Sequence, residues 1–238
     1  MKKVYIFVAL VVILIFAVGW RAYAPGSSNS SIFGNKSKST KTTTKKISPS
    51  FNKNKHSISD PRSIWIVVNK QRPLKPIDYT PLDLTPVGNG QLMRKEAAAA
   101  LANLIAAAAG QGLKITADSG YRSYAIQVSV YNNEVRQHGQ AVADSESAKP
   151  GYSEHQTGFA VDVGGGGCNI EDCFANTKEG KWVAEHAYEY GFILRYTADK
   201  QSVTGYRYEP WHIRYVGTEL STEMNNDGIT TLEEFFGL

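Results

Sequence analysis

Two of the five histidines lie in sequence contexts that suit metal binding. His155 belongs to the stretch SEHQTGFAVD (residues 153–162), and His212 belongs to the stretch EPWHIRY (residues 209–215). Both stretches combine imidazole and carboxylate side chains, the donors with which proteins bind zinc. The remaining histidines have no acidic or histidine neighbour in a ligand arrangement and are interpreted as structural or solvated: His56, His138 and His186.

Asp162 is a carboxylate in an apolar setting. It falls in a predicted strand over residues 159–163, where alternation places it on the face opposite to the apolar side chains. Those side chains are Phe159, Val161 and Val163. A carboxylate with a valine on each side needs a polar partner, because burying an unpaired charge is costly. Asp162 is therefore a candidate ligand.

The spacing of these residues permits one shared site. Gly158 allows a tight backbone path between His155 and the strand. His155 and Asp162 can then converge on one ion, with His212 from a neighbouring strand as the third ligand. Three nitrogen or oxygen ligands with one open position describe a catalytic zinc site.

Glu209 is the natural general base for such a site. A regular strand would place Glu209 and His212 on opposite faces, but Pro210 interrupts the ladder between them. We expect a bend there, from which the Glu209 carboxylate reaches the metal centre. A lone histidine or aspartate is usually a structural group, so the hypothesis rests on the four residues together.

Three separated motifs resemble those of the VanY-type D-alanyl-D-alanine carboxypeptidases. This group belongs to the wider lysostaphin/D-Ala-D-Ala family of zinc peptidases, peptidase family M15. The motifs, in chain order, are SGYRSYxxQ (residues 119–127), SxHxxGxAxD (residues 153–162) and ExWH (residues 209–212). The resemblance runs from about Ser63 to the C-terminus, with no departure at the metal or base positions.

The resemblance implies a role for each matched residue. His155, Asp162 and His212 bind Zn²⁺, and Glu209 acts as the general acid and base. Arg122 stabilises the developing oxyanion or holds the substrate. Ser153 and Gln127 contact the end of the peptide. As a neighbour of Tyr121 and Ser123 at a strand-to-helix turn, Arg122 suits a site role better than a surface ion pair.

Cys168 and Cys173 are the only cysteines, and they lie close together after a run of four glycines. In an exported protein, a local disulfide is the preferred interpretation of such a pair. Free thiols and metal ligands are the alternatives. The glycine run carries neither a GxGxxG pattern nor a Lys-Ser/Thr pair, so it is interpreted as a loop and not as a phosphate site.

Helices and strands are predicted to alternate without a regular βαβ repeat. Strands are expected at 64–68, 113–117, 159–163, 192–196 and 211–216. Helices are expected from Arg94 to Ala109 with Gly110 as the C-cap, from a Ser123 cap to about Gln137, from a Thr177 cap to Gly191, and after a Thr231/Glu234 capping box. This pattern favours an α+β fold in which a small antiparallel sheet carries the zinc site and helices flank it.

The N-terminal segment predicts export. Lys2 and Lys3 precede an uncharged apolar run of seventeen residues from Val4 to Trp20. As a helix the run rises about 26 Å, close to the ~30 Å hydrocarbon core of a bilayer. We expect residues 1–20 to be a transmembrane anchor. A cleaved signal segment is the alternative, although the run is long for a signal core and Pro25 would follow the cut after AYA.

Residues 21–59 are rich in Ser, Thr, Lys and Asn and are predicted to be a disordered basic stalk before a folded domain at 60–238. Residues 1–59 carry ten Lys or Arg and no acid, which leaves 16 basic and 22 acidic residues for the remainder. The overall charge of +4 therefore comes from the leader and stalk. It does not indicate a nucleic-acid-binding face.

These observations predict a single-pass membrane protein whose catalytic domain faces the cell wall. The expected substrate is a peptidoglycan stem peptide, and the expected reaction is D,D-carboxypeptidase removal of its terminal D-alanine. An L,D-carboxypeptidase or an endopeptidase on the same scaffold remains open. A non-catalytic wall-binding module is disfavoured by the intact ligand set and Glu209.

Overall fold

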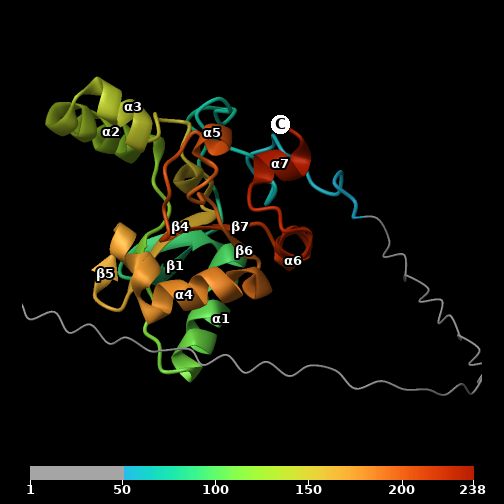
Figure 1. Cartoon of the computed structure of the whole chain (residues 1–238). Coiled ribbons are helices and arrows are strands. Elements are labelled where there is room, and N and C mark those ends of the chain that lie inside the picture. The colour runs from blue at the N-terminus through green and yellow to red at the C-terminus, as the bar shows by residue number, and fades with distance from the viewer. Residues whose placement is uncertain (1–50) are drawn as a thin grey trace, which may run out of the picture. The chain divides into compact units, whose positions relative to one another are not determined.

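The computed structural model describes residues 51–238 (Figure 1). The predicted anchor at 1–20 and most of the predicted stalk lie outside the described residues. Within residues 51–238, none of the helices has both the length and the apolar character that a bilayer crossing requires.

The domain is built on a five-stranded sheet with the order β3–β4–β7–β6, and the short β5 pairs with the end of β4. All pairings are antiparallel. The strands are β3 (Thr116–Ser119), β4 (Ala160–Gly165), β5 (Cys168–Asn169), β6 (Phe192–Leu194) and β7 (His212–Tyr215). A separate hairpin joins β1 (Leu84–Gly88) to β2 (Gln91–Arg94).

Helices flank the sheet, as the α+β prediction requires. Figure 1 shows α1 and α4 on one side of the sheet and the α2–α3 pair on the other. The helices are α1 (Lys95–Gly110), α2 (Tyr124–His138), α3 (Gln140–Glu146), α4 (Lys178–His186), α5 (Gln201–Thr204), α6 (Thr218–Asp227) and α7 (Leu232–Phe236). Short 3-10 helices cover Glu154–Thr157 (η1), Asp172–Asn176 (η2) and Ala187–Tyr190 (η3).

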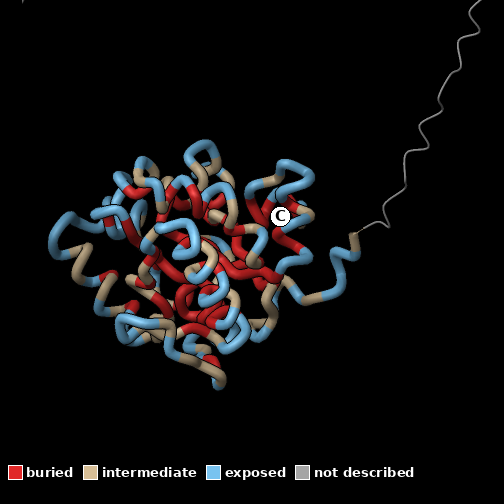
Figure 2. Tube along the Cα trace, turned by 90° about the horizontal axis from the view of Figure 1, so that it is seen from below, coloured by how far each residue is buried: buried red, intermediate tan, exposed pale blue. Residues whose placement is uncertain are grey.

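The main core lies between the sheet and the helix α1. Leu101, Leu104 and Ala108 lie on one face of α1 and are fully buried, where they join Val161 and Ile213 from the central strands. Figure 2 shows the buried chain concentrated inside a shell of exposed loops and helix faces. The apolar face of β4 thus packs on α1, which leaves its other face free for the polar residues of the site.

The three predicted N-caps are confirmed, whereas the predicted C-cap at Gly110 is wrong, because Gly110 is still part of α1 and Gln111 is the C-cap. The side chains of Ser123, Thr177 and Thr231 accept hydrogen bonds from backbone N–H groups in the first turns of α2, α4 and α7. These hydroxyls replace the intrahelical partners that the first N–H groups of a helix lack. Helix α1 ends one residue later than expected, at Gly110, and Gly112 takes the left-handed conformation with φ 76°.

The prediction of a strand at 64–68 is wrong, although most of this apolar segment is buried. Residues 65–68 are buried but form no strand. The Arg214 guanidinium donates to the carbonyl oxygens of Ile64 and Ile66, at 3.1 and 2.7 Å. A side chain therefore satisfies backbone groups that a neighbouring strand would otherwise bind.

The folded domain begins before the predicted boundary at Asp60. Phe51 stacks on Trp65 with ring centroids 5.4 Å apart and meets Phe235 of α7 edge-on at the same distance. Lys53 donates to the Phe235 carbonyl, and Lys55 pairs with Glu219. Residues 51–59, assigned to the stalk from their composition, therefore pack on the C-terminal helices.

Gly120 marks a close approach between β3 and the β1–β2 hairpin. A Cβ atom at this position would lie 2.4 Å from the carbonyl oxygen of Leu92. The adjacent Tyr121 N–H donates to that oxygen at 2.7 Å, so the two backbones cannot separate without losing a hydrogen bond. We expect Gly120→Ala to destabilise the metal-free protein by about 2 kcal/mol, measured by chemical denaturation.

Gly110 provides the matched control. It lies in α1 with open space around its Cα, and a Cβ there meets nothing within 4 Å. Gly110→Ala should be neutral or stabilising by up to about 1 kcal/mol, because alanine favours the helix. Equal stability of the Gly120→Ala and Gly110→Ala proteins would contradict the steric argument.

Candidate active site

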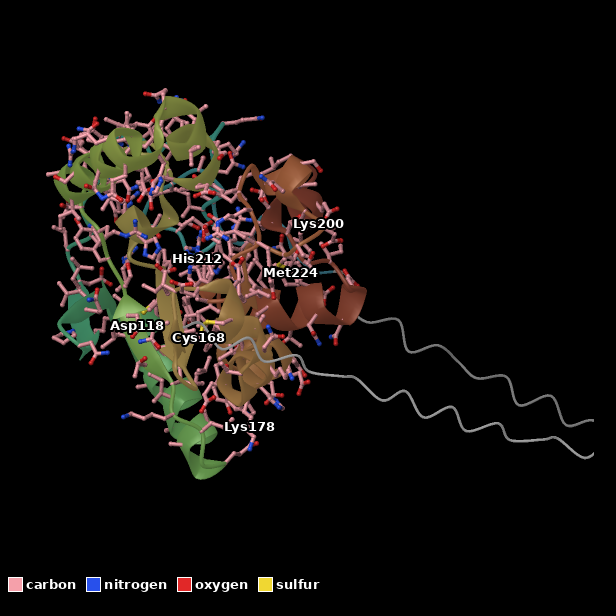
Figure 3. All side chains as sticks on the ribbon, turned by 60° about the vertical axis from the view of Figure 1, so that its left-hand side comes forward. Asp118, Cys168, Lys178, Lys200, His212 and Met224 are labelled. Atoms are coloured by element: carbon pink, nitrogen blue, oxygen red, sulfur yellow. A yellow bond between two sulfur atoms is a disulfide. The ribbon has the colours of Figure 1, made fainter. Side chains whose placement is uncertain are left out.

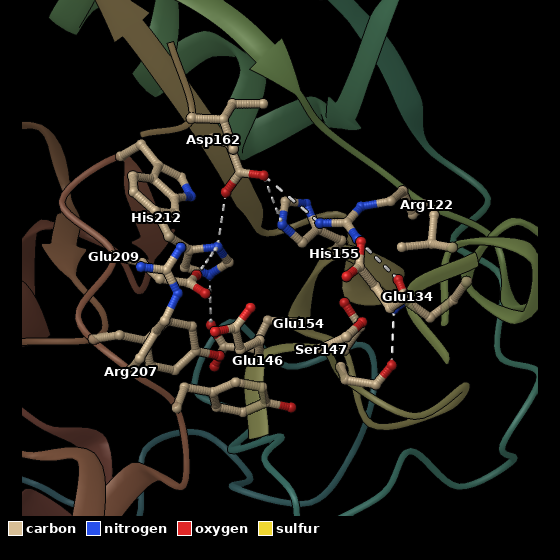
Figure 4. A pocket seen from close by; sticks show the side chains of 18 residues that line it. Arg122, Glu134, Glu146, Ser147, Glu154, His155, Asp162, Arg207, Glu209 and His212 are labelled. Atoms are coloured by element: carbon tan, nitrogen blue, oxygen red, sulfur yellow. Dashed lines mark hydrogen bonds and ion pairs between the residues drawn. The ribbon is translucent and has the colours of Figure 1, made fainter. Parts of the chain in front are cut away.

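A cavity of about 280 Å³ opens beside the ends of the central strands, between the sheet and the α2–α3 pair (Figure 4). All seven residues predicted to bind metal, transfer protons or contact substrate line this one cavity. They are Arg122, Gln127, Ser153, His155, Asp162, Glu209 and His212. His212, labelled in Figure 3, is buried inside the domain.

The register of the sheet brings the acidic candidate ligand to one histidine. Asp162 of β4 lies directly opposite His212 of β7. Its Oδ1 accepts from His212 Nδ1 at 2.9 Å, and its Oδ2 lies 3.3 Å from His155 Nε2. One ligand atom from each of the three residues lies within 4.8 Å of the others, and all three side chains are buried.

A short turn brings the second histidine to the same point. His155 lies in η1, which ends at Gly158 in the left-handed conformation with φ 72°. A Cβ atom there would lie 2.8 Å from Arg94 Cγ, so glycine serves both the turn and the close packing. His155 Nδ1 donates to the Gly120 carbonyl at 2.7 Å, which leaves Nε2 to face Asp162.

The charges of the buried set differ between the two imidazoles. Burial, with the nearby Arg122 cation, lowers the pKa of His155 to about 4. His212 is equally buried, but the carboxylates of Asp162 and Glu154 overcome the effect of burial and raise its pKa to about 9. The two imidazoles hold the pKa of Asp162 well below its usual range against the opposing effect of burial.

Glu209 lies in the bend that the sequence predicts. The His212 N–H donates to the Glu209 carbonyl at 3.1 Å across Pro210, which forms a turn before β7. The Glu209 Oε2 atom lies 3.9 Å from His212 Nδ1. Burial raises the pKa of Glu209 to about 7, the range in which a carboxylate can both accept and return a proton near neutral pH.

Arg122 extends from the turn before α2 toward the metal set. Its Nη2 lies 3.6 Å from Asp162 Oδ2, and its Nη1 donates to Gln127 Oε1 at 3.0 Å. The Gln127 amide in turn donates to the Ala148 carbonyl at 2.9 Å. Ser153 is buried at the start of η1, where its hydroxyl makes no capping hydrogen bond. A cation, an amide and a hydroxyl therefore face the cavity.

Several residues that line the cavity were not predicted from the sequence to belong to the site. The Tyr196 ring lies against His212 with centroids 4.8 Å apart and against Tyr206 at 4.6 Å. Arg207 lies over Trp211 at 5.2 Å. Tyr206 and Arg207 belong to no motif and to no predicted element, so only the fold shows that they line the cavity.

The predicted disulfide is confirmed. Cys168 and Cys173 are bridged, and the loop that they close adjoins the cavity. Ile170 lines the cavity with a left-handed φ of 51°, and Asp172 pairs with Arg207 at 3.0 Å. A β-branched residue with positive φ is strained, so the closed loop holds a conformation that an open chain would disfavour.

The donor set fits zinc. Two imidazoles and a carboxylate converge on one point, and each side of the carboxylate already faces a ring nitrogen. Zinc held by three such ligands, with the remaining side open to a cavity, is typical of hydrolytic enzymes. The α+β fold and this donor set place the chain in the class of zinc hydrolases.

Comparison with known families makes the class specific. The family model VanY, described as D-alanyl-D-alanine carboxypeptidase, matches residues 90–218, more than half of the chain. The chain belongs to this VanY family of zinc-dependent carboxypeptidases. All seven predicted site residues lie inside the matched region.

Two curated relatives extend the match beyond the motifs. A putative carboxypeptidase, YodJ of Bacillus subtilis (strain 168), is 42% identical over 190 residues, which cover 75% of this chain and 69% of the relative. A D-alanyl-D-alanine carboxypeptidase of Enterococcus faecalis (strain ATCC 700802 / V583) is 35% identical over 179 residues, covering 71% of this chain and 64% of the relative. The chain thus spans about two thirds of the length of these relatives.

Solved structures with this fold include enzymes of two specificities. The LD-carboxypeptidase LdcB superposes with a TM-score of 0.69 at 41% identity, over 74% of this chain and 87% of that one. VanYB in complex with D-alanine-D-alanine superposes with a TM-score of 0.65 at 34% identity, over 74% of this chain and 97% of that one. A VanY D,D-pentapeptidase in complex with Zn(II) superposes with a TM-score of 0.63 at 33% identity, over 73% and 98%.

The charge of the site predicts how zinc affinity depends on pH. Without metal, the His212 ring is a doubly protonated cation below about pH 9, and it must lose one proton before a ring nitrogen can bind metal. From pH 7.5 to 8.5, above the Glu209 pKa of about 7, metal binding should release about one proton and the zinc affinity should rise about tenfold per pH unit. Competition with a chromophoric chelator measures this slope, and a flat profile would contradict the protonation state of His212.

Proposed function

We propose that this chain is a carboxypeptidase that removes the C-terminal D-alanine from peptidoglycan stem peptides. The observation that carries the proposal is Glu209, whose carboxyl group has a pKa of about 7 and lies 3.9 Å from His212 Nδ1. A base of matched pKa beside a metal set is what hydrolysis of an amide bond requires.

Each side chain then has a defined task. Zinc, held by His155, Asp162 and His212, would polarise the scissile carbonyl and lower the pKa of the attacking water. Glu209 accepts the proton of that water and returns it to the leaving amine. Arg122, beside Asp162, offers a cation to the negative charge that develops on the carbonyl oxygen or to the carboxylate of the substrate.

The polar side chains of the cavity also suit a substrate with a free C-terminal carboxylate. A carboxypeptidase must bind the terminal carboxylate close to the bond that it cleaves, and cationic and hydroxyl donors serve that purpose. Arg122, Gln127 and Ser153 face one cavity with the metal set. An endopeptidase has no terminal carboxylate to bind, so this group of donors favours the carboxypeptidase.

Two stereochemical specificities are compatible with the scaffold. D,D-carboxypeptidase activity, on pentapeptide stems, is supported by the description of the matching family. L,D-carboxypeptidase activity, on tetrapeptide stems, is supported by identity: LdcB is 41% identical to this chain, against 34% for VanYB. Both specificities use the same metal chemistry and differ in the pocket next to the scissile bond.

We also propose that the domain works outside the cell, tethered by the apolar segment at residues 4–20. Two features support this location. The stem peptide lies in the wall, and the Cys168–Cys173 disulfide suits an oxidising compartment.

Replacement of the base separates catalysis from metal binding. Glu209→Gln keeps the size of the side chain and removes the proton acceptor, so zinc content should stay near one per chain while kcat falls by roughly 10²-fold or more. Glu185→Gln, on the exposed surface of α4, should leave both unchanged. Turnover near the wild-type rate in zinc-loaded Glu209→Gln protein would assign the base to another group.

Defined stem peptides test the substrate. We expect peptides that end in free D-alanine to be shortened by one residue in mass spectrometry, and the same peptides with an amidated C-terminus to resist. A site built for a carboxylate rejects its neutral analogue because the buried donors lose their partner. Equal cleavage of both forms would identify an endopeptidase.

The same assay resolves the stereochemistry and the role of the cation. Pentapeptide cleavage identifies a D,D-carboxypeptidase, and tetrapeptide cleavage identifies an L,D-carboxypeptidase. Arg122→Ala should slow hydrolysis of the preferred peptide. A rise confined to KM assigns Arg122 to substrate binding, and a fall in kcat assigns it to the transition state.

A further inference from the structure

Two buried polar atoms face one another behind the metal set. Glu154 Oε2 lies 3.5 Å from His212 Nε2, and both side chains are almost completely buried. Neither atom has a hydrogen-bond partner among the described residues. Unpartnered buried groups are uncommon in folded proteins, and a facing pair calls for an explanation.

The Glu154 carboxylate has its other oxygen fully engaged. Arg195 Nε donates to Oε1 at 2.9 Å, and Arg214 Nη1 donates to the same atom at 2.7 Å. Both cations therefore bind one oxygen, although a carboxylate can accept on two. This arrangement leaves Oε2 directed at His212.

The two arginines are themselves fixed, so the carboxylate cannot turn away. Arg195 binds Glu233 of α7 through two hydrogen bonds, at 2.7 and 3.0 Å. Arg214 donates to the backbone carbonyls of Ile64, Ile66 and Tyr215. Two guanidinium groups balance two carboxylates, which is the condition under which charges remain stable in a protein interior.

We propose that Glu154 is a positioning residue for the metal ligand His212. When His212 gives up its Nδ1 proton to bind metal, Glu154 accepts a hydrogen bond from the remaining Nε2–H. This contact fixes the tautomer whose lone pair is on Nδ1, the nitrogen that faces Asp162. The inference rests on the metal role of His212 proposed above. Its consequence is that the metal affinity of the site depends on a residue that does not touch the metal.

The tautomer of His155 is also fixed by a hydrogen bond to the ring nitrogen that faces away from Asp162, but in His155 that nitrogen is Nδ1. His155 Nδ1 donates to the Gly120 carbonyl, so its Nε2 faces Asp162. His212 presents Nδ1, so an acceptor is needed behind its Nε2. The carbonyl and the carboxylate therefore play equivalent roles on the two sides of the site. Only the carboxylate is a side chain that substitution can change.

Glu154→Gln tests the proposal without changing the volume of the side chain. The glutamine has one acceptor oxygen, which the two guanidinium groups of Arg195 and Arg214 will bind. Its NH₂ then faces His212 Nε2 and favours the tautomer with the proton on Nδ1. We expect the dissociation constant for zinc, measured by chelator competition at fixed pH, to rise by about 10- to 100-fold.

Glu233→Gln is the matched control. It also removes one buried carboxylate from Arg195, but it contacts neither histidine ligand. We expect this variant to lose stability and to keep the wild-type dissociation constant for zinc. An unchanged constant in Glu154→Gln, or an equal rise in Glu233→Gln, would overturn the proposal and leave a purely structural role for the ion network.

A measurement on the wild-type protein covers the case in which Glu154→Gln does not fold. Nitrogen-15 NMR of the zinc-loaded protein should show His212 with a proton on Nε2 and the metal on Nδ1. The reverse assignment would overturn the proposal. A wild-type protein that binds no zinc would instead refute the proposed function, so the two failures are distinguishable.

Discussion

Asp162 and His212 face each other across the β4–β7 pair, and the register of that pair sets the geometry of the site. A slip of one residue would turn each side chain to the opposite face of the sheet. It would carry the Asp162 carboxylate into the core against α1, away from both imidazoles, at a cost of several kcal/mol for an unpaired charge. His155 lies in the turn before β4, and Glu209 lies in the turn before β7. The register of the two strands therefore determines whether these side chains lie beside Asp162 and His212.

The sequence alone was enough to predict those features that depend on residues close together in the chain. Gly158 and Pro210 each dictate a backbone shape within a few residues of a functional side chain, and the structure has both the tight turn and the bend. The three helix caps were predictable for the same reason, because a capping hydroxyl acts on N–H groups only two or three residues away. Cys168 and Cys173 likewise form a bridge across a short loop.

What the sequence could not supply depends on contacts between distant segments. Glu154 is adjacent to His155, yet its partners Arg195 and Arg214 lie 41 and 60 residues further along the chain. The stretch at 64–68 has the composition of a strand, and only Arg214, 148 residues beyond Ile66, explains why its carbonyls have no strand partner. The hairpin β1–β2 and helix α3 were missed, since neither has a strong periodic pattern of its own.

The packing of Phe51 on Trp65 and Phe235 has a practical consequence for where the chain can be cut. A fragment that begins at Asp60 would uncover the surface of Trp65 and Phe235 that Phe51 covers, and exposed aromatic surface of this kind promotes self-association. It would also remove Lys55 from Glu219 on α6. A soluble, monodisperse version of the domain therefore has to retain the polar segment from Phe51 onward, although its composition suggests a dispensable spacer.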